Sequence, residues 1–527
     1  MTTYDSDMQE HDLHILRHVV EEFDGRMALD SAVIQSGRLP VGTPVELLSW
    51  HREHARRRFL HTTKGRWRMV QQFDLIIVGA GSGNTIPGPD HVGWTIAIIE
   101  KDKFGGTCLN RGCIPSKMLI HAADVAETIH TAAPLGITAR VERLDWDRLT
   151  GRVWQRIDPL AEAGEEWRQT QPNTTVFKGE ARFIGEKTLE VNGQRLTAPR
   201  VILAAGSRPA IPDIPGLDQV VSHTSDTIMR LPRQPQCMAI LGGGYIGAEL
   251  GHFFGALSTE MTIINRGDRL LQREDEEISQ RFTDLYARRF TVLLKTQVQR
   301  VRQQADTMTL DLSVDGRPQQ VTCEVLLLAV GRVPNTDLLD VARAGIAVDA
   351  QGRVVTNVYH ETTVPGIWAL GDIASPHQLK HAANAEARTV AYNVAHPTRQ
   401  RRGNDFAMPH AVFASPQVAS VGLTERQVQE QGLPYVIGKR AYSATAYGWA
   451  IGDTESFVKL IAHAETRQVL GAHLIGPHAA ILLQPLVNAM RFGETVDQLA
   501  HDTFYIHPAL TEVVEQALLE IAPPAAQ

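Results

Sequence analysis

The chain contains several short apolar runs that end in glycine or in other small residues. The clearest of them occupy residues 73–78, 201–203, 238–241 and 324–330. A continuous apolar run of this length is typical of a strand that is buried on both faces of a parallel sheet. The pattern therefore favours an α/β protein, and two of the runs lead directly into glycine-rich turns.

The first glycine-rich turn follows residues 73–78 and indicates a dinucleotide site. A second strand, at residues 95–99, ends in an acid that lies 19 residues beyond Gly81. Glycines let the backbone approach a pyrophosphate at a helix N-terminus, and an acid at this spacing holds a ribose hydroxyl. An ordinary tight turn remains the alternative, because asparagine replaces the third glycine of the motif. The candidate residues are Gly79, Gly81, Gly83, Asn84 and Glu100.

The second turn follows residues 238–241 and is a complete G-x-G-x-x-G motif that opens a helix. Its glycines are Gly242, Gly244 and Gly247. Two such units imply two dinucleotides, or one dinucleotide cofactor and one dinucleotide substrate.

The strand after this second turn predicts which nucleotide is bound. Residues 261–264 are followed by Asn265 and Arg266 where an acid would favour NADH, and Arg269 and Arg273 come next. Arginines without the acid favour the 2′-phosphate of NADPH. The alternative is that these arginines belong to a solvated face.

Composition and charge narrow the class of protein further. The chain has 527 residues, enough for three or four domains, with 43% hydrophobic and 21% charged residues. A net charge of −7 argues against nucleic acid as a general partner. The acidic, polar residues 1–7 do not resemble a signal peptide, and no apolar run approaches membrane-spanning length. We therefore expect a cytoplasmic protein with no membrane partner.

Residues 1–70 carry no recognisable chemistry, and the run from Arg52 to Arg68 is basic. Such a run is either a partner-binding arm or a solvated linker, and we expect an appendage of unknown role outside the core fold.

Two of the four cysteines, Cys108 and Cys113, stand in a small-residue run just before a helical pattern at residues 118–126. A helix N-terminus favours a thiolate, and a thiolate beside a second thiol can attack a disulfide and resolve the mixed intermediate. A zinc site would need further ligands nearby, and a structural disulfide would close only a small loop. The pair is therefore predicted to be redox-active, and its position after a dinucleotide unit suits a flavin as electron donor.

Two further candidates lie in the second half of the chain. Asp372 ends an apolar run at residues 366–370 and could bind a polyol such as the ribityl chain of a flavin, while the helix predicted at 381–394 could face its ring. His507 and Glu512 could form a base that a carboxylate orients. Taken alone, a histidine before proline is more often structural.

Together, these motifs resemble those of the class I pyridine nucleotide–disulfide oxidoreductases, the family of glutathione reductase and dihydrolipoamide dehydrogenase, from about Phe73 to Ile521. The resemblance implies two Rossmann-like domains, which bind FAD and NADPH, and a C-terminal α+β dimerisation domain, without a metal. The expected parts are an extension at 1–70, an FAD-binding domain at 71–212 and 341–407, an NADPH-binding domain at 213–340, a dimerisation domain at 408–521 and a tail at 522–527.

The resemblance also implies a role for each motif. Electrons would pass from NADPH to FAD, to the Cys108–Cys113 disulfide and then to a small-molecule disulfide. Cys108 would attack the substrate, and Cys113 would be the thiolate in contact with flavin. His507 of the other subunit, oriented by Glu512, would protonate the leaving thiol, so the expected homodimer shares its active sites. Further implied residues are Lys117 and Glu249 as an ion pair beside the flavin, Gly106, Thr107 and Gly206 for FAD, and Gly331 for NADPH.

Within the family, residues 81–84, 225–230, 379–381, 386–388 and 446–450 are most similar to the mycothione reductase branch. Dihydrolipoamide dehydrogenase, an alternative, normally has an acid where Asn265 stands and uses NAD. Mercuric reductase and the larger thioredoxin reductases need an extra C-terminal cysteine pair, and no cysteine follows Cys323. From another class, a non-catalytic flavin redox sensor would not need His507 and Glu512.

Overall fold

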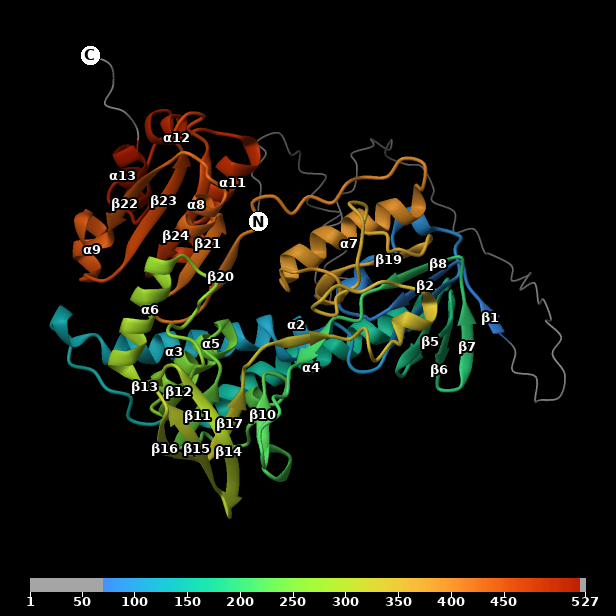
Figure 1. Ribbon diagram of the computed structural model, residues 1–527, viewed down its shortest axis with the longest axis horizontal. Helices are drawn as coiled ribbons and strands as arrows, with labels where there is room; N and C mark the ends of the chain where they lie inside the picture. The colour runs from blue at the N-terminus through green and yellow to red at the C-terminus, as the bar shows by residue number, and fades with distance from the viewer. Residues whose placement is uncertain (1–69, 522–527) are drawn as a thin grey trace, which may run out of the picture. The chain divides into compact units, whose positions relative to one another are not determined.

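A computed structural model describes residues 70–521 of the protein (Figure 1). Residues 1–69 of the predicted extension, with their basic run, and the predicted tail at 522–527 lie outside the described residues. The domain boundaries expected from the sequence stay predictions, and the elements below are given as the structure has them.

The first parallel sheet forms where the apolar runs predict it. Its five strands have the order β19-β8-β2-β3-β4, and every neighbouring pair is parallel. The strands are β2 (Leu75–Val78), β3 (Ile96–Glu100), β4 (Thr174–Lys178), β8 (Arg200–Leu203) and β19 (Ile367–Ala369). Their central residues are buried on both faces of the sheet, as a continuous apolar run requires.

The expectation of a helix directly after the first glycine-rich turn is wrong. Between β2 and β3 the chain forms only two short 3₁₀ turns, η1 (Ser82–Thr85) and η2 (Pro89–His91). Pro87, Pro89 and the glycines around them interrupt any α-helix here. Helix α7 (Lys380–Ala395) covers this part of the sheet instead, and its Ala387 and Val390 pack with the inner side chains of β2 and β3.

The cysteine motif spans a break between two helices, α2 (Gly106–Arg111) and α3 (Cys113–His130), so the predicted helix at 118–126 is confirmed and is longer. Helix α4 (Trp146–Thr170) packs against α3. A small four-stranded sheet has the order β1-β7-β6-β5. Its strands are β1 (Val70–Gln72), β5 (Ala181–Gly185), β6 (Thr188–Val191) and β7 (Gln194–Thr197).

The second dinucleotide unit has its own parallel sheet, of order β10-β17-β11-β12-β13. The strands are β10 (Ser222–Thr224), β11 (Cys237–Leu241), β12 (Glu260–Ile264), β13 (Thr291–Leu293) and β17 (Val325–Leu328). Here α5 (Tyr245–Ala256) follows the glycine-rich turn as predicted, and α6 (Glu276–Arg289) follows β12. An antiparallel sheet of β14 (Thr296–Gln304), β15 (Thr307–Val314) and β16 (Arg317–Cys323) completes the unit. The segments that enter and leave it pair as β9 (Ser207–Pro209) with β18 (Arg332–Pro334).

After residue 408 the chain forms a separate, antiparallel sheet. The order is β20-β21-β24-β23-β22. The strands are β20 (His410–Val412), β21 (Val418–Gly422), β22 (Tyr435–Ala441), β23 (Phe457–His463) and β24 (Val469–Ile475). The helices are α8 (Glu425–Glu430), α9 (Ala446–Ile451), α10 (Ala479–Leu482), α11 (Gln484–Phe492), α12 (Val496–His501) and α13 (Thr511–Ile521). Further 3₁₀ turns are η3 (Ala133–Leu135), η4 (Leu217–Gln219), η5 (Ile228–Arg230), η6 (Val341–Ala344), η7 (Gly371–Ile373) and η8 (Tyr442–Ala444).

Candidate active site

The carboxyl edge of the first sheet opens into a cavity of about 870 Å³, which is large enough for a dinucleotide. Segments of α2, α3, α5, α7 and the chain around β20 complete its wall. The residues predicted for FAD or catalysis that line it are Gly79, Gly81, Glu100, Gly106, Thr107, Cys108, Cys113, Lys117, Gly206, Glu249 and Asp372. The structure thus brings together residues that lie far apart in the sequence.

The first glycine-rich turn and Glu100 form one end of the cavity. Gly79 has a φ of 105°, and a Cβ atom there would come within 2.2 Å of the carbonyl oxygen of Ala204, so only glycine fits. The Ala80 N–H donates to Glu100 Oε2 over 2.7 Å, and the Asp102 N–H donates to Oε1 over 2.9 Å. Burial raises the pKa of Glu100. The backbone of the glycine-rich turn is therefore accessible beside the fixed carboxyl group of Glu100. This arrangement fits a pyrophosphate and a ribose.

Gly83 and Asn84 do not line the cavity. Gly83 is buried, and a Cβ atom there would lie 2.9 Å from Cβ of Ala204. The Asn84 side chain accepts a 2.7 Å hydrogen bond from Nε of Arg168, a buried residue of α4. Both residues hold the turn against its neighbours, and Arg168 gave no signal in the sequence because its partner lies 84 positions away.

The two cysteines lie in adjacent helices on the cavity wall. Cys108 lies in α2, and Cys113 is the first residue of α3, where the positive end of the helix dipole favours a thiolate. The Cys108 thiol donates a hydrogen bond to the Cys113 sulfur, which lowers the pKa of Cys113 to about 7; burial opposes this shift and Lys117 supports it. The same hydrogen bond, with burial, raises the pKa of Cys108. One proton is therefore shared unequally, with the negative charge on Cys113.

Lys117 and Glu249 form an ion pair, as predicted. Lys117 Nζ lies 2.7 and 2.6 Å from the two carboxylate oxygens of Glu249, which α5 of the second unit contributes. The Phe413 N–H donates to Glu249 Oε1 over 3.0 Å, and Lys117 Nζ lies 4.7 Å from the centre of the Phe413 ring. The pair thus joins the dithiol helix to the second unit and to the C-terminal domain.

Asp372 lies in η7 and faces the cavity together with two residues that sequence reasoning missed. Ser207 Oγ donates to Asp372 Oδ2 over 2.7 Å, and Nε of the nearly buried Arg332 donates to Ser207 Oγ over 2.7 Å. Arg332 directly follows Gly331, and a charge after a buried apolar run was an available signal. Tyr245 and Lys380 also line the cavity and were missed.

The second glycine-rich turn has the geometry of a nucleotide site but lies outside this cavity. Gly242 has a φ of 117°, and a Cβ atom there would meet the Ala329 carbonyl oxygen at 2.3 Å. Gly244 caps α5, and Gly247 packs against the Gly242 backbone. Gly331 lies between β17 and β18. Because α5 follows immediately, free N–H groups stand at a helix N-terminus, where they favour a phosphate.

The side chains after β12 have distinct partners. Asn265 accepts a hydrogen bond from the Gly243 N–H over 3.2 Å and donates to the Arg269 carbonyl over 2.8 Å, so it braces the turn. Arg269 pairs with Glu276. Arg266 and Arg273 are exposed and have no ion-pair partner within residues 70–521. These two arginines are therefore available to an anion beside the turn.

His507 and Glu512 contact each other, but neither lines the cavity. His507 Nδ1 lies 2.7 Å from Glu512 Oε1 at the start of α13. The His507 side chain is 73% exposed, and its Nε2 atom has no hydrogen-bond partner within residues 70–521. Glu512 therefore fixes the orientation of the imidazole, and Nε2 remains available to a group that lies outside this chain's own cavity.

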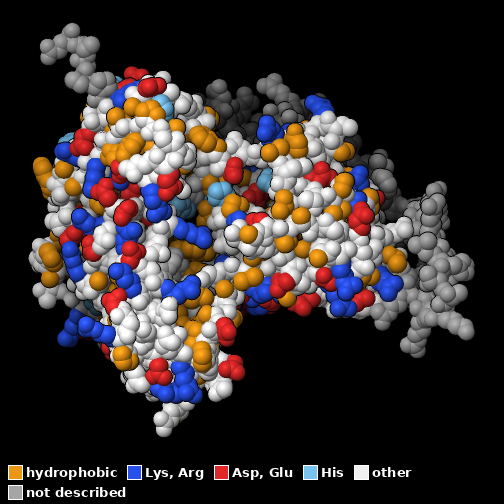
Figure 2. Space-filling view, in the orientation of Figure 1, with side chains coloured by type: hydrophobic (Ala, Val, Ile, Leu, Met, Phe, Trp, Pro, Cys, Tyr) orange, Lys and Arg blue, Asp and Glu red, His pale blue; other side chains and the backbone are white. Residues whose placement is uncertain are grey.

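Within residues 70–521, no cluster of His, Cys, Asp or Glu is arranged to hold a metal ion, and no helix is long and apolar enough to cross a bilayer. On the face shown in Figure 2, acidic and basic side chains are interspersed.

Comparison with known proteins gives two matches to family profiles. The profile described as pyridine nucleotide-disulphide oxidoreductase matches residues 73–389, and the profile of the dimerisation domain of these enzymes matches residues 408–518.

Individual relatives cover most of the chain. Mycothione reductase of Mycobacterium tuberculosis is 42% identical over 460 residues, which are 85% of this chain and 99% of that protein. Dihydrolipoyl dehydrogenase of Chlamydia muridarum is 32% identical over 466 residues, 86% of this chain and 98% of that one. Mercuric reductase of Staphylococcus aureus is 31% identical over 459 residues, 85% and 82% of the two chains.

Among solved structures, the Cu(II) complex of the HOCl-induced flavoprotein disulfide reductase RclA from Escherichia coli matches with a TM-score of 0.76 and 26% identity. The match covers 86% of this chain and all of that one.

Proposed function

The chain belongs to the pyridine nucleotide-disulphide oxidoreductases, and within that family we propose that it is an NADPH-dependent flavoprotein that reduces mycothione, the disulfide of mycothiol. The observation that carries the proposal is the Cys108–Cys113 pair, which lines a dinucleotide-sized cavity with its charge placed on Cys113. An oxidoreductase of this family uses flavin and a pyridine nucleotide; the choice of NADPH and of substrate belongs to the proposal.

The substrate assignment is supported by similarity along nearly the whole length of one relative. Identity to mycothione reductase is 42%, against 31–32% for the mercuric reductase and dihydrolipoyl dehydrogenase relatives. No cysteine follows Cys323, so the chain lacks the C-terminal cysteine pair expected of a mercuric reductase. Asn265 stands where a dihydrolipoamide dehydrogenase normally has an acid; its amide carries no charge, and both its oxygen and its nitrogen bond to backbone groups.

The cavity residues fit FAD. Glu100 would hold a ribose hydroxyl, Asp372 the ribityl chain, and the backbone at Gly79 and Gly81 the pyrophosphate. Bound there, FAD would carry electrons from the nicotinamide to the cysteine pair. Lys117 and Glu249 would stand beside its ring, with Lys117 also stabilising the Cys113 thiolate.

The two cysteines would divide the reduction of the substrate between them. Cys108 would pass its proton to His507 of the partner subunit and attack one sulfur of the substrate disulfide, so the substrate S–S bond breaks, the first thiolate leaves and takes up that proton, and a mixed disulfide forms. The Cys113 thiolate then attacks the Cys108 sulfur, which releases the second thiol and closes the Cys108–Cys113 disulfide. The hydrogen bond between the thiols places Cys113 within reach for that second step.

The proton for each leaving thiolate would come from His507 of the partner subunit, with Glu512 fixing the ring through Nδ1. The chain has a dimerisation domain, which supports a homodimer. The exposed imidazole outside the chain's own cavity supports an active site that two subunits share.

A panel of disulfides tests the proposal. The holoenzyme is mixed with mycothione, lipoamide, glutathione disulfide or Hg²⁺, each with NADPH and with NADH, and nucleotide oxidation is followed. The proposal requires the highest kcat/KM for mycothione with NADPH. Preference for lipoamide with NADH would identify a dihydrolipoyl dehydrogenase, and flavin reduction without turnover of any substrate would identify a redox sensor.

A further inference from the structure

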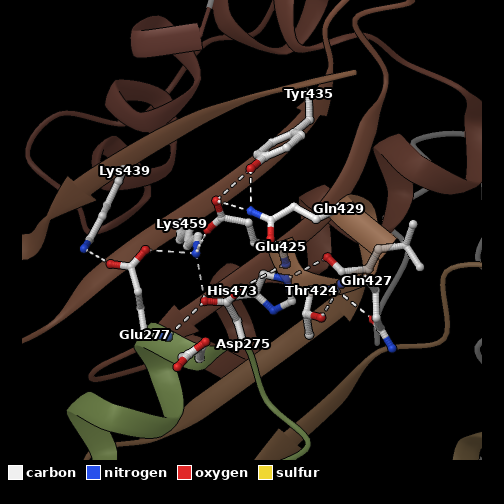
Figure 3. A network of polar contacts seen from close by, with 12 residues as sticks. Asp275, Glu277, Thr424, Glu425, Gln427, Gln429, Tyr435, Lys439, Lys459 and His473 are labelled. Atoms are coloured by element: carbon white, nitrogen blue, oxygen red, sulfur yellow. Dashed lines mark hydrogen bonds and ion pairs between the residues drawn. The ribbon is translucent and has the colours of Figure 1, made fainter. Parts of the chain in front are cut away.

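A buried lysine joins the C-terminal domain to the nucleotide-binding unit. Lys459 of β23 is only 1% exposed, and its Nζ lies 2.9 Å from Asp275 Oδ1, 2.9 Å from Glu277 Oε1 and 2.6 Å from Glu425 Oε2 (Figure 3). An ammonium group has three N–H donors, so all three are used. Asp275 caps α6 and Glu277 lies in its first turn, whereas Glu425 begins α8, so the lysine connects the nucleotide-binding unit to the C-terminal domain.

Asp275 is held from both sides. Its Oδ1 accepts from the Glu277 N–H over 3.2 Å and caps α6, and its Oδ2 accepts from the Glu425 N–H over 3.1 Å. Burial alone would raise the pKa of Asp275, but the bond from Lys459 and the neighbouring charges outweigh it and hold the pKa below its usual value. The carboxylate therefore stays ionised and is fixed to the C-terminal domain.

The preceding residue, Glu274, is anchored to the same domain. Its Oε1 lies 2.7 Å from His410 Nε2 of β20, and Ser420 Oγ of β21 donates to its Oε2 over 2.6 Å. Two consecutive acids thus end the loop between β12 and α6 in buried contacts with the C-terminal domain.

The other contacts of this loop reach the second glycine-rich turn. The Leu271 N–H donates to the Gly243 carbonyl over 2.8 Å, and Asn265 Oδ1 accepts from the Gly243 N–H. The Glu274 N–H donates to the Leu271 carbonyl over 2.9 Å. Backbone bonds therefore run from the turn, through Leu271, to the acids that Lys459 and the C-terminal strands hold. Arg266 and Arg273, for which the described part of the chain offers no ion-pair partner, lie on this same loop.

We propose that Lys459 is a positioning residue for the nucleotide: from the dimerisation domain it holds the end of the β12–α6 loop, so that Arg266 and Arg273 face the 2′-phosphate of a nucleotide whose pyrophosphate is bound at the glycine-rich turn. The inference rests on the proposed use of NADPH. Lys459 touches neither the turn nor the arginines, and it acts through Asp275.

The test compares four variants of the flavin-loaded holoenzyme. Lys459→Met removes the buried charge, and Asp275→Asn keeps an N-cap but weakens the bond to Lys459. Lys439→Met removes a half-exposed lysine that pairs with Glu277 in the same network, and Glu425→Gln keeps the backbone bond to Asp275, so these two are matched controls. Flavin reduction by NADPH and by NADH is followed without any disulfide, so the result does not depend on the substrate.

Lys459→Met and Asp275→Asn should raise the apparent dissociation constant for NADPH roughly 3- to 30-fold, the range typical of coupling through a network. The constant for NADH should change much less, and the flavin reduction rate at saturating nucleotide should stay near that of the wild type. Lys439→Met and Glu425→Gln should bind both nucleotides as the wild type does. A general loss of structure would weaken the binding of both nucleotides equally. The ratio of the dissociation constants for NADPH and NADH is therefore the deciding quantity.

An unchanged ratio in Asp275→Asn and in folded Lys459→Met, with a wild type that prefers NADPH, overturns the inference and leaves the proposed function intact. If Lys459→Met does not fold, Asp275→Asn alone decides. A wild type without a preference for NADPH overturns the inference together with the nucleotide assignment.

Discussion

At the scale of single residues, the two thiols of the pair differ because one hydrogen bond places the charge on Cys113. Cys108→Ser should abolish disulfide reduction while FAD still binds, since serine cannot form the mixed disulfide. Cys113→Ser should in addition remove the long-wavelength absorbance of a thiolate against flavin in the reduced enzyme. Steady-state turnover and the visible spectrum measure both effects, and turnover that survives in either variant would exclude the dithiol mechanism.

The same hydrogen bond predicts a pH dependence. The pKa of Cys113 is lowered to about 7, so its thiolate should form as the pH rises through this value and be lost below it. Cys108→Ala removes the donor and should move the midpoint up by about one to two pH units, since a hydrogen bond to a charged group contributes about 1.5–3 kcal/mol.

The ultraviolet thiolate absorbance of the reduced protein measures this midpoint. The absorbance of the Cys113→Ser variant is subtracted to remove the contribution of the other cysteines. Cys108→Ser keeps a hydroxyl donor and should shift it less. A midpoint that remains near 7 in Cys108→Ala would contradict the assignment.

At the scale of elements, the arginines of the β12–α6 loop differ in their contacts: Arg269 pairs with Glu276, whereas Arg266 is exposed. Arg266→Ala should raise KM for NADPH much more than KM for NADH, because a lost charge-assisted bond to phosphate costs on the order of 1–3 kcal/mol. Arg269→Ala is a matched control on the same loop: Arg269 already pairs with Glu276, so the ratio of the two KM values should change less. A wild-type preference for NADH would refute the prediction.

The first glycine-rich turn keeps the backbone geometry of its motif, although the secondary structure that follows it is different. Gly79 and Glu100 occupy the places that the motif predicts, although a 3₁₀ turn replaces the expected helix. Because Arg168 and the α7 residues support the turn, its position comes from packing and not from a helix of its own.

At the scale of the whole molecule, the dimerisation domain carries large exposed apolar side chains, among them Ile481, Phe492, Phe504 and Ile506. Ile506 directly precedes His507, and Phe504 lies three residues before it. Figure 2 shows hydrophobic side chains on the surface of this domain. A pairing face beside the histidine is what an active site shared by two subunits requires.

Mixing two inactive variants tests this arrangement. His507→Ala should slow thiol release by roughly 10²–10⁴-fold, the usual scale for a lost acid–base group, while flavin reduction by NADPH stays nearly normal. Exchange of Cys108→Ser and His507→Ala subunits should then restore activity, because random exchange gives roughly half heterodimers, each with one intact site. Native mass spectrometry confirms the exchange, and no gain in activity after it would rule out a shared site.

The sequence by itself determined the local features of this protein. The strands, both glycine-rich turns, the cysteine spacing and the pairing of His507 with Glu512 follow from apolar runs and from residues close together along the chain. These features depend on backbone conformation and short-range geometry, which neighbouring residues control.

Only the tertiary structure decided which distant side chains meet. Arg168 reaches Asn84, Arg332 reaches Ser207, and Lys459 reaches Asp275, across separations from 84 to 184 residues. Buried polar groups need hydrogen-bond partners, but the partner is whichever group the packed elements bring near. A local sequence pattern therefore does not predict it. For the same reason the sequence placed arginines after β12, whereas the fold decided that Arg269 is paired and that Arg266 and Arg273 have no ion-pair partner within residues 70–521.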